Sequence, residues 1–397
     1  MTSDAREFDL VLFGATGFTG GLVAKHLAAH AGPSVRLALA GRRADALNAL
    51  RDRLLAAHPE RAQIGVVVAD VSDPDSLARM AASTRAVLST VGPFLDYGEP
   101  VVSACVAQGT DYLDSTGEHP FVRRMIERYH QDAKQRGVRL IFSCAFEAVP
   151  TDLGVYYTVQ RLPEGKPIDI VGYLAFRGVF SGGTERSAIK DMAAQRPEAA
   201  EYAYEQAGRR GALLPGRVHR APAVGAWVSP FDAIDPHIVL RSAAALERYG
   251  PNFTYTNLLI HPNLFALLGL AMVFGTAALL ARVAPVRALM LRVVKPSGRG
   301  PTEAQMASGW FRLRLDAQCE DQRVTTEVSG GDPGYGATSM MLGQCALCLL
   351  EDNTTPPMCS GVVTPAQVFG DRLIARLQAH GMRFRVSDGA TGPRKED

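Results

Sequence analysis

A glycine-rich turn directly after a short apolar run constrains this chain most strongly. The apolar run covers residues 8–13, the turn is Gly14-Ala15-Thr16-Gly17-Phe18-Thr19-Gly20, and an amphipathic stretch follows at 22–29. A strand, a glycine turn and a helix in this order are typical of a dinucleotide-binding unit. Gly14 allows the tight turn, Gly17 lets the backbone approach a pyrophosphate, and Gly20 lets the helix pack on its strand. The helix N-terminus then offers free N–H groups to the phosphates.

The end of the next predicted strand favours a phosphorylated cofactor. That strand covers residues 35–40, and Gly41, Arg42 and Arg43 follow it. A site for NAD places an acidic residue here to accept a hydrogen bond from the ribose 2′-hydroxyl, and this chain has none. A guanidinium suits a 2′-phosphate, so the pair predicts NADPH rather than NADH. The alternative is that both arginines are solvated charges on a loop.

The remaining expected cofactor contacts follow from the order of the strands. We expect the pyrophosphate to lie along Gly14, Thr16, Gly17, Phe18, Thr19 and Gly20. Asp70 follows the third predicted strand and should lie near the adenine. Gly92 and Pro93 follow the fourth and should lie near the nicotinamide ribose, because ligands of open α/β sheets bind at the carboxyl ends of the strands.

The pattern of strands and helices predicts an α/β fold. Up to residue 150, strands at 64–68, 86–90, 112–114 and 139–142 alternate with helices at 73–82, 98–108 and 120–136. This alternation is typical of a Rossmann-type, doubly wound parallel sheet. After Pro150 we expect strands at 168–177, 234–242, 311–318 and 323–329, and helices at 187–195, 337–350 and 365–380. The predicted domains are therefore a Rossmann domain at 1–150, an α+β substrate domain at 151–330, and C-terminal helices at 331–397 that return to the first domain.

Composition excludes some classes of function. The net charge is only +2 and no basic stripe with aromatic residues occurs, so we expect no nucleic-acid partner. The six scattered cysteines and the polar residues 1–9 indicate the cytoplasm. Cys345 and Cys348 form a C-x-x-C without a second ligand pair nearby, which favours core packing, and we expect no metal site.

One apolar segment stands apart. No Asp, Glu, Lys or Arg occurs between Arg248 and Arg282, and residues 264–281 are apolar except for Thr276. As a helix this segment reaches about 27 Å, slightly short of a ~30 Å hydrocarbon core. Its basic flank is Arg282, Arg287, Arg292 and Lys295.

A single membrane crossing is disfavoured, because the chain before and after the segment is expected to form one body. Two alternatives remain, a buried helix of a lipid-sized pocket and an interfacial helix that docks on a membrane. Both favour an apolar substrate.

Several motifs along the chain resemble one family. They lie at residues 8–20, 40–42, 90–94, 97–98, 109–112, 116–118, 144–152, 181–184, 331–335 and 361–366. The chain resembles the saccharopine dehydrogenase-like oxidoreductases and, more narrowly, the mycobacterial trans-acting enoyl reductases. The resemblance implies a Rossmann domain, a substrate domain and NADPH. It also implies a role in lipid or glycolipid synthesis near the plasma membrane, with an acyl substrate that a carrier protein holds. A homo-oligomer is expected.

Enoyl reduction requires a hydride at the β-carbon, a proton at the α-carbon and a donor near the thioester oxygen. Tyr97 is the first candidate for catalysis and Glu118 the second, because both follow strands at the ligand-binding edge. The alternatives are a packed aromatic ring for Tyr97 and helix capping for Glu118.

We expect Asp152 to cap the helix after it, and residues 181–184 either to present N–H groups or to form a turn. Two other functions remain open, reduction of another carbonyl or imine and a non-catalytic NADP(H)-binding scaffold at the membrane.

Overall fold

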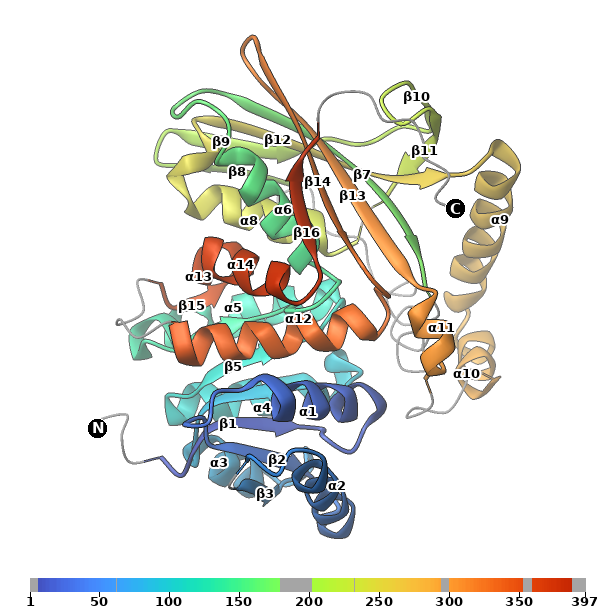
Figure 1. The fold of residues 1–397 in the computed structure, drawn as a ribbon. Coiled ribbons are helices and arrows are strands. Elements are labelled where there is room, and N and C mark those ends of the chain that lie inside the picture. The colour runs from blue at the N-terminus through green and yellow to red at the C-terminus, as the bar shows by residue number, and fades with distance from the viewer. Residues whose placement is uncertain are drawn as a thin grey trace.

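Two β-sheets organise the part of the chain that the computed structural model describes, which is residues 6–61, 63–178, 202–231, 233–293, 300–352 and 359–387. The sheets lie one above the other in Figure 1, with the N-terminal sheet below. The expected helix at 187–195 and the motif at 181–184 fall outside the described residues.

The first sheet has seven strands, all parallel, in the order β15-β6-β5-β4-β1-β2-β3. These are β1 Phe8–Phe13, β2 Leu37–Gly41, β3 Ile64–Val68, β4 Thr84–Ser89, β5 Asp111–Asp114, β6 Arg139–Ile141 and β15 Gly361–Val363. The order reverses between β1 and β4, which defines the switch point where doubly wound sheets bind ligands. The predicted Rossmann-type sheet is confirmed.

Helices cover both faces of the first sheet, and β1 shows why. Leu10 and Leu12 point into one core cluster, whereas Val11 and Phe13 point into the other. A strand buried on both faces needs this continuous apolar run. Helices α1 Phe18–His30, α2 Ala44–Ala57 and α12 Gly336–Leu347 contribute to the first cluster, and α3 Pro74–Ala82, α4 Phe94–Gln108 and α5 His119–Arg136 to the second.

The second sheet is mixed. Seven strands follow the order β10-β11-β12-β7-β13-β14-β16, while β9 pairs with β12 and β8 pairs with β9. The strands are β7 Ile168–Arg177, β8 Ala203–Gln206, β9 Arg209–Leu213, β10 His219–Ala221, β11 Ala226–Pro230, β12 Asn252–His261, β13 Trp310–Cys319, β14 Gln322–Gly330 and β16 Arg383–Val386. Helix α6 Val149–Val159 leads from the first sheet and packs on β13 and β14.

The strand predicted at 234–242 is wrong, because the structure has helix α8 at Asp235–Ala245 there. Pro236 stands in the first turn, where a helix tolerates proline. Nearly every position of α8 is buried. A helix buried all round lacks the one-sided apolar stripe that distinguishes it from a strand. The 3₁₀ turn Glu247–Tyr249 and strand β12, which the sequence did not indicate, follow it.

The C-terminal segment is more than a pair of helices. Helix α12 packs on α1, as expected, and continues as a π-helical turn at Cys348–Asp352. The single helix predicted at 365–380 is wrong, because Gly370 at φ 52° separates α13 Pro365–Val368 from α14 Asp371–Ala379. The segment also adds β15 to the first sheet and β16 to the second.

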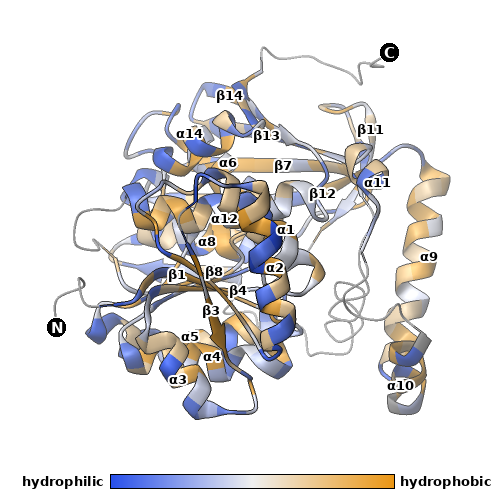
Figure 2. Cartoon of the chain, turned by 60° about the horizontal axis from the view of Figure 1, so that its bottom comes forward, coloured by the Kyte–Doolittle hydropathy of each residue, from blue (hydrophilic) through white to orange (hydrophobic). Residues whose placement is uncertain are grey.

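The apolar segment forms an exposed helical arm. It consists of α9 Leu264–Ala281 and α10 Ala284–Val293, and the short α11 Glu303–Ala307 follows. Figures 1 and 2 show the arm at the margin of the molecule, and the orange in Figure 2 marks the hydrophobic residues of α9. Only Leu267 and Ala281 of α9 are buried. Of the two alternatives raised by the sequence, the buried helix of a pocket is therefore wrong.

Candidate functional site

The glycine turn has the geometry that a close backbone approach requires. Gly14 adopts φ 88°, a conformation that favours glycine. Its N–H donates to the Ala40 carbonyl of the neighbouring strand over 2.9 Å. A Cβ at Gly20 would lie 2.2 Å from the Gly14 carbonyl oxygen. The turn therefore brings α1 against the end of β1 in a way that a side chain at either position would prevent.

The N-terminus of α1 fits a phosphate. Its N-cap is Gly17, which offers no side chain to cap the helix, and the first turn contains no acidic residue. Gly17 is exposed, and Thr16, Phe18 and Thr19 are partly exposed. Uncapped N–H groups and the positive end of the helix dipole favour an anion at this position.

Arg42 and Arg43 lie at the carboxyl end of β2, beside the glycine turn, and both are exposed. Among the described residues neither guanidinium makes a hydrogen bond or an ion pair, so both remain available to a 2′-phosphate. Asp70, two residues after β3, accepts hydrogen bonds from the Ser72 N–H at 2.9 Å and the Ser72 hydroxyl at 2.7 Å. These bonds, with a smaller contribution from Arg42, hold the pKa of the Asp70 carboxyl below its usual range.

The loop after β4 completes the same edge. Gly92 is exposed and Pro93 is the N-cap of α4. Tyr97, in the first turn of α4, is 42% exposed, so its phenol faces solvent rather than the core. The residues that the sequence predicted for the cofactor therefore lie at one edge, where the parallel strands end, and their contacts with a cofactor stay a prediction.

Glu118 occupies a different place from the one predicted. Its side chain does not cap its own helix, α5. Instead its two carboxylate oxygens accept hydrogen bonds from the backbone N–H groups of Phe94, at 2.9 Å, and Leu95, at 2.8 Å. Glu118 is 2% exposed. It thus fixes the start of α4 beside Gly92 and Pro93, a geometry that suits a positioning role better than proton transfer.

Asp152 also departs from the expected capping. It lies within the first turn of α6, and its carboxylate accepts hydrogen bonds from the Ser242 hydroxyl, at 2.6 Å, and the Ala366 N–H, at 2.8 Å. Burial raises the pKa of Asp152 to about 7. The residue joins α6, α8 and the start of α13, so its role is to hold elements together.

Sequence reasoning missed Glu147 as a candidate for catalysis. This residue lies in the loop between β6 and α6, at the carboxyl edge of the first sheet. A Cβ placed at Gly117, which follows β5, would lie 3.2 Å from the Glu147 Cγ. Oε2 of Glu147 is buried and has no hydrogen-bond partner in the described part of the chain. Burial raises the pKa of this carboxyl to about 7. An acidic residue in an otherwise apolar loop after a sheet strand was the signal in the sequence.

Tyr335, in the turn between β14 and α12, contacts the glycine turn. Its ring contacts Phe18 edge to face, with centroids 5.0 Å apart at 82°. Asp332 holds the turn before α12 by accepting hydrogen bonds from the N–H groups of Tyr335, at 2.9 Å, and Gly336, at 3.0 Å. The motif at 331–335 therefore supports Phe18 from the other side of the site.

A cavity of about 280 Å³ opens between α5 and α8. Its walls include Val122, Ile126 and Ile238, and its polar margin includes His119, whose ring centroid is 4.3 Å from that of His237. His119 directly follows Glu118, so this mostly apolar cavity begins beside the carboxyl edge of β5.

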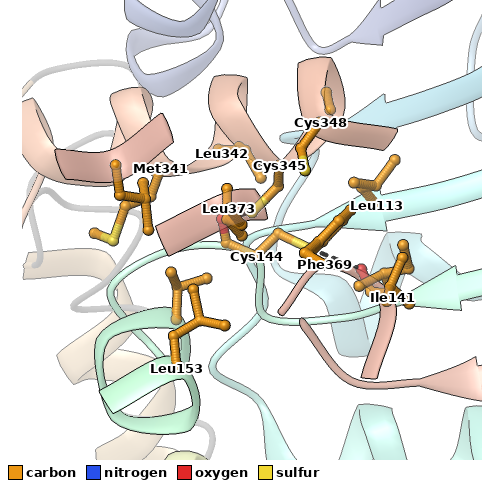
Figure 3. Close-up of a cluster of buried hydrophobic side chains, with 14 of the residues drawn as sticks. Leu113, Ile141, Cys144, Leu153, Met341, Leu342, Cys345, Cys348, Phe369 and Leu373 are labelled. Atoms are coloured by element: carbon orange, nitrogen blue, oxygen red, sulfur yellow. Dashed lines mark hydrogen bonds between the residues drawn. The ribbon is translucent and has the colours of Figure 1, made fainter. Parts of the chain in front are cut away.

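Core packing is confirmed for the C-x-x-C pair. Figure 3 shows Cys345 and Cys348 among buried apolar side chains, with Cys144 beside them. The Cys345 thiol points at the Cys144 carbonyl oxygen over 3.7 Å. Burial raises the pKa of the Cys144 and Cys348 thiols, so they remain protonated.

The fold and this edge define an oxidoreductase that depends on NADP. The chain matches the family model of the saccharopine dehydrogenase NADP binding domain over residues 10–141. It is 37% identical, over 98% of this chain and 99% of the relative, to a Mycobacterium tuberculosis protein named for trans-acting enoyl reductase activity. It is 34% identical, over 96% of this chain and 98% of the relative, to the trans-acting enoyl reductase of Mycobacterium ulcerans.

The chain therefore belongs to the family of the trans-acting enoyl reductases, within the saccharopine dehydrogenase-like oxidoreductases. Its fold is that of apo saccharopine dehydrogenase (L-Glu forming) from Saccharomyces cerevisiae, with a TM-score of 0.53 at 13% identity, over 96% of this chain and 100% of that chain.

Proposed function

We propose that this protein reduces the carbon–carbon double bond of an α,β-unsaturated acyl thioester in lipid synthesis. The observation that carries the proposal is the meeting of a phosphate-binding turn, two available arginines and a buried acid at one sheet edge. Relatives named for enoyl reduction over nearly the full length support the same reaction. When bound, NADPH supplies the hydride that adds to the β-carbon.

Glu147 is the proposed proton source. Its carboxyl, with a pKa of about 7, is protonated in a large fraction of molecules at neutral pH. Transfer of that proton to the α-carbon completes the reduction and leaves Glu147 as a carboxylate, which solvent reprotonates. A general acid is most effective when its pKa lies near the working pH. Tyr97, exposed at the mouth of the same edge, is the proposed hydrogen-bond donor to the thioester oxygen.

The substrate chain is proposed to occupy the cavity between α5 and α8. The cavity begins beside Glu118 and His119 and is lined by seven aliphatic residues together with five polar or aromatic ones, which are His119, Arg123, Tyr204, His237 and Arg241. Burial of methylene groups against such walls contributes about 0.8 kcal/mol for each group. An apolar acyl chain, held by a carrier at its thioester end, suits both the cavity and the polar edge.

The arm is proposed to dock on the surface of an anionic membrane and collect this substrate. Large apolar side chains on α9 face solvent, with Phe265 85% exposed and Met272 72% exposed. Arg282 and Arg292 are exposed at the far end of the arm, and they complement acidic lipid headgroups. An exposed apolar helix with basic residues beside it is typical of an interfacial anchor.

The sheet topology favours docking over a single membrane crossing. Strand β12 precedes the arm and β13 follows it, and both pair with β7 in the second sheet. The chain therefore leaves and re-enters the same sheet on one side of any bilayer. By length and composition alone α9 could span a membrane, but a single crossing would separate β12 from β13. Shallow insertion into one face of a membrane is the arrangement compatible with both features.

The test is product analysis. Purified protein with NADPH and an enoyl thioester should yield the saturated acyl chain, and Glu147→Gln should bind NADPH normally while losing turnover. A hydroxylated product would indicate reduction of a carbonyl instead. Tight NADPH binding with no turnover of any acyl thioester would favour a cofactor-binding scaffold.

A further inference from the structure

Three histidines from distant parts of the chain meet on the side of the first sheet that carries α1. His26 and His30 lie one turn apart on α1, and His380 is the C-cap residue of α14. Their ring centroids are 4.5, 4.8 and 5.5 Å apart. One ring nitrogen from each lies within 4.8 Å of those of the other two. A pair of histidines spaced i and i+4 with a third from another element is a common ligand arrangement for a transition metal.

The hydrogen bonds of His380 orient it as a ligand. Its Nδ1 lies 2.8 Å from the Arg376 carbonyl oxygen. Because a carbonyl only accepts, Nδ1 carries the proton and the lone pair of the neutral ring is on Nε2, which faces Gln344. Metal-binding histidines are commonly fixed in this way by a carbonyl on the other ring nitrogen.

The side-chain amide of Gln344 marks the point where the lone pairs converge. Its Nε2 lies 2.8 Å from the His26 Nε2 and 3.2 Å from the His380 Nε2. The Gln344 Oε1 accepts a hydrogen bond from Arg376 Nη1 at 3.3 Å. The NH₂ group therefore donates to both rings, and both rings present acceptor nitrogens to one point. A cation in place of this NH₂ group would therefore face the lone pairs of the His26 and His380 Nε2 atoms.

The accessibility of the cluster also suits a metal. His30 is exposed, which leaves an open path for an ion and freedom for its ring to turn inward. Tetrahedral zinc with bonds of about 2.05 Å places nitrogens about 3.3 Å apart, so binding requires the rings to turn inward and the Gln344 amide to move aside.

We propose that His26, His30 and His380 bind one Zn²⁺ ion, which fastens α1 to α14. Three imidazoles favour Zn²⁺ over Mg²⁺ or Ca²⁺, which prefer oxygen ligands. Helix α1 has 13 residues and is about 20 Å long, and its first turn faces the cofactor. The zinc site is therefore far from the reacting atoms, and its role is to hold the C-terminal segment on the Rossmann domain.

Zinc titration of the full chain, purified without a histidine tag, tests this proposal. Wild type, stripped with a chelator, should bind one equivalent of Zn²⁺ and unfold at a higher temperature when loaded. His30→Ala alters an exposed side chain and should weaken zinc binding at least tenfold while the metal-free fold stays intact. His219→Ala, an exposed histidine on β10, is the matched control and should bind like wild type.

Gln344→Ala separates a metal site from a purely structural hydrogen-bond cluster. Removing the amide frees both ring nitrogens, so zinc should bind more tightly although the metal-free protein loses the three hydrogen bonds of the Gln344 side chain. Co²⁺ in place of zinc should give the intense visible absorption of a tetrahedral site in wild type and not in His30→Ala. Equal zinc binding by wild type and His30→Ala, or zinc binding that Gln344→Ala does not strengthen, would overturn the proposal.

Discussion

The carboxyl edge of the first sheet and the arm of α9 and α10 are opposite in chemical character. At the edge lie the N–H groups of the glycine turn, two exposed arginines and the Glu147 carboxyl, which suit a charged cofactor. On the arm, Phe265 and Met272 expose apolar surface that a soluble protein normally covers. The difference shows that each region suits a different ligand, because the cofactor is a polyanion and the proposed substrate is an apolar acyl chain. The predictions for the two regions are independent, so those for one can fail while those for the other hold.

The largest expected effect is at Glu147. Glu147→Gln keeps the shape of the side chain but removes the transferable proton, so kcat should fall about 100- to 10,000-fold. The dissociation constant of NADPH should not change, which a fluorescence titration checks. Glu118→Gln is the comparison, because it weakens the hold on α4 instead, and we expect it to lower protein stability. A Glu147→Gln enzyme with normal kcat would remove this residue from the reaction.

The pH dependence sharpens the same assignment. Only the protonated carboxyl of Glu147 donates, and its pKa is about 7. The rate should therefore be constant in mild acid and fall as the pH rises above about 7, with loss of one proton. Steady-state rates between mildly acidic and mildly basic pH measure this. A rate that rises with pH over the same range contradicts a general-acid role.

The arginine pair is the next test. A charge-assisted hydrogen bond from a guanidinium to the 2′-phosphate contributes about 1.5–3 kcal/mol to binding. Arg42→Ala with Arg43→Ala should therefore weaken NADPH binding by that amount per arginine and leave NADH binding nearly unchanged, as paired fluorescence titrations would measure. Arg53→Ala, at an exposed position further along α2, removes a similar surface charge and is the control. Equal weakening for both cofactors would show that the arginines do not bind the 2′-phosphate.

These predictions rest partly on residues that the sequence alone could identify. The glycine turn and the arginines lie within 30 residues of each other, and local pattern with strand order was enough to place them. Glu118 was assigned to the wrong helix, because its partners, Phe94 and Leu95, belong to an element 23 residues earlier. The histidine cluster depends on His380, which only the packed C-terminal segment brings beside α1. Long-range contacts of this kind leave no local pattern.

The second sheet was harder to predict for a physical reason. Helix α8 is buried on nearly all sides, so its sequence lacks a polar face. By contrast, β13 has alternating buried and half-exposed residues, and its strand was predicted almost to its ends. Exposure to water on one side is what gives an element a recognisable pattern in the sequence.

The smallest expected effect concerns the arm. Leu268→Asp with Val273→Asp places charges on two exposed positions of α9, 53% and 66% exposed. Each apolar side chain contributes at most about 1.5–3 kcal/mol to membrane binding, so co-sedimentation with anionic vesicles should fall clearly. Val218→Asp, 53% exposed outside the arm, is the control. Unchanged sedimentation of the double variant would contradict docking through α9.

The most direct test of the central claim is the product formed from an enoyl thioester with NADPH deuterated at the transferred position. We predict a saturated acyl chain with one deuterium at the β-carbon, formed by wild type and lost in Glu147→Gln. An acyl chain that keeps its double bond while the protein holds NADPH tightly would contradict the assignment of this site to enoyl reduction.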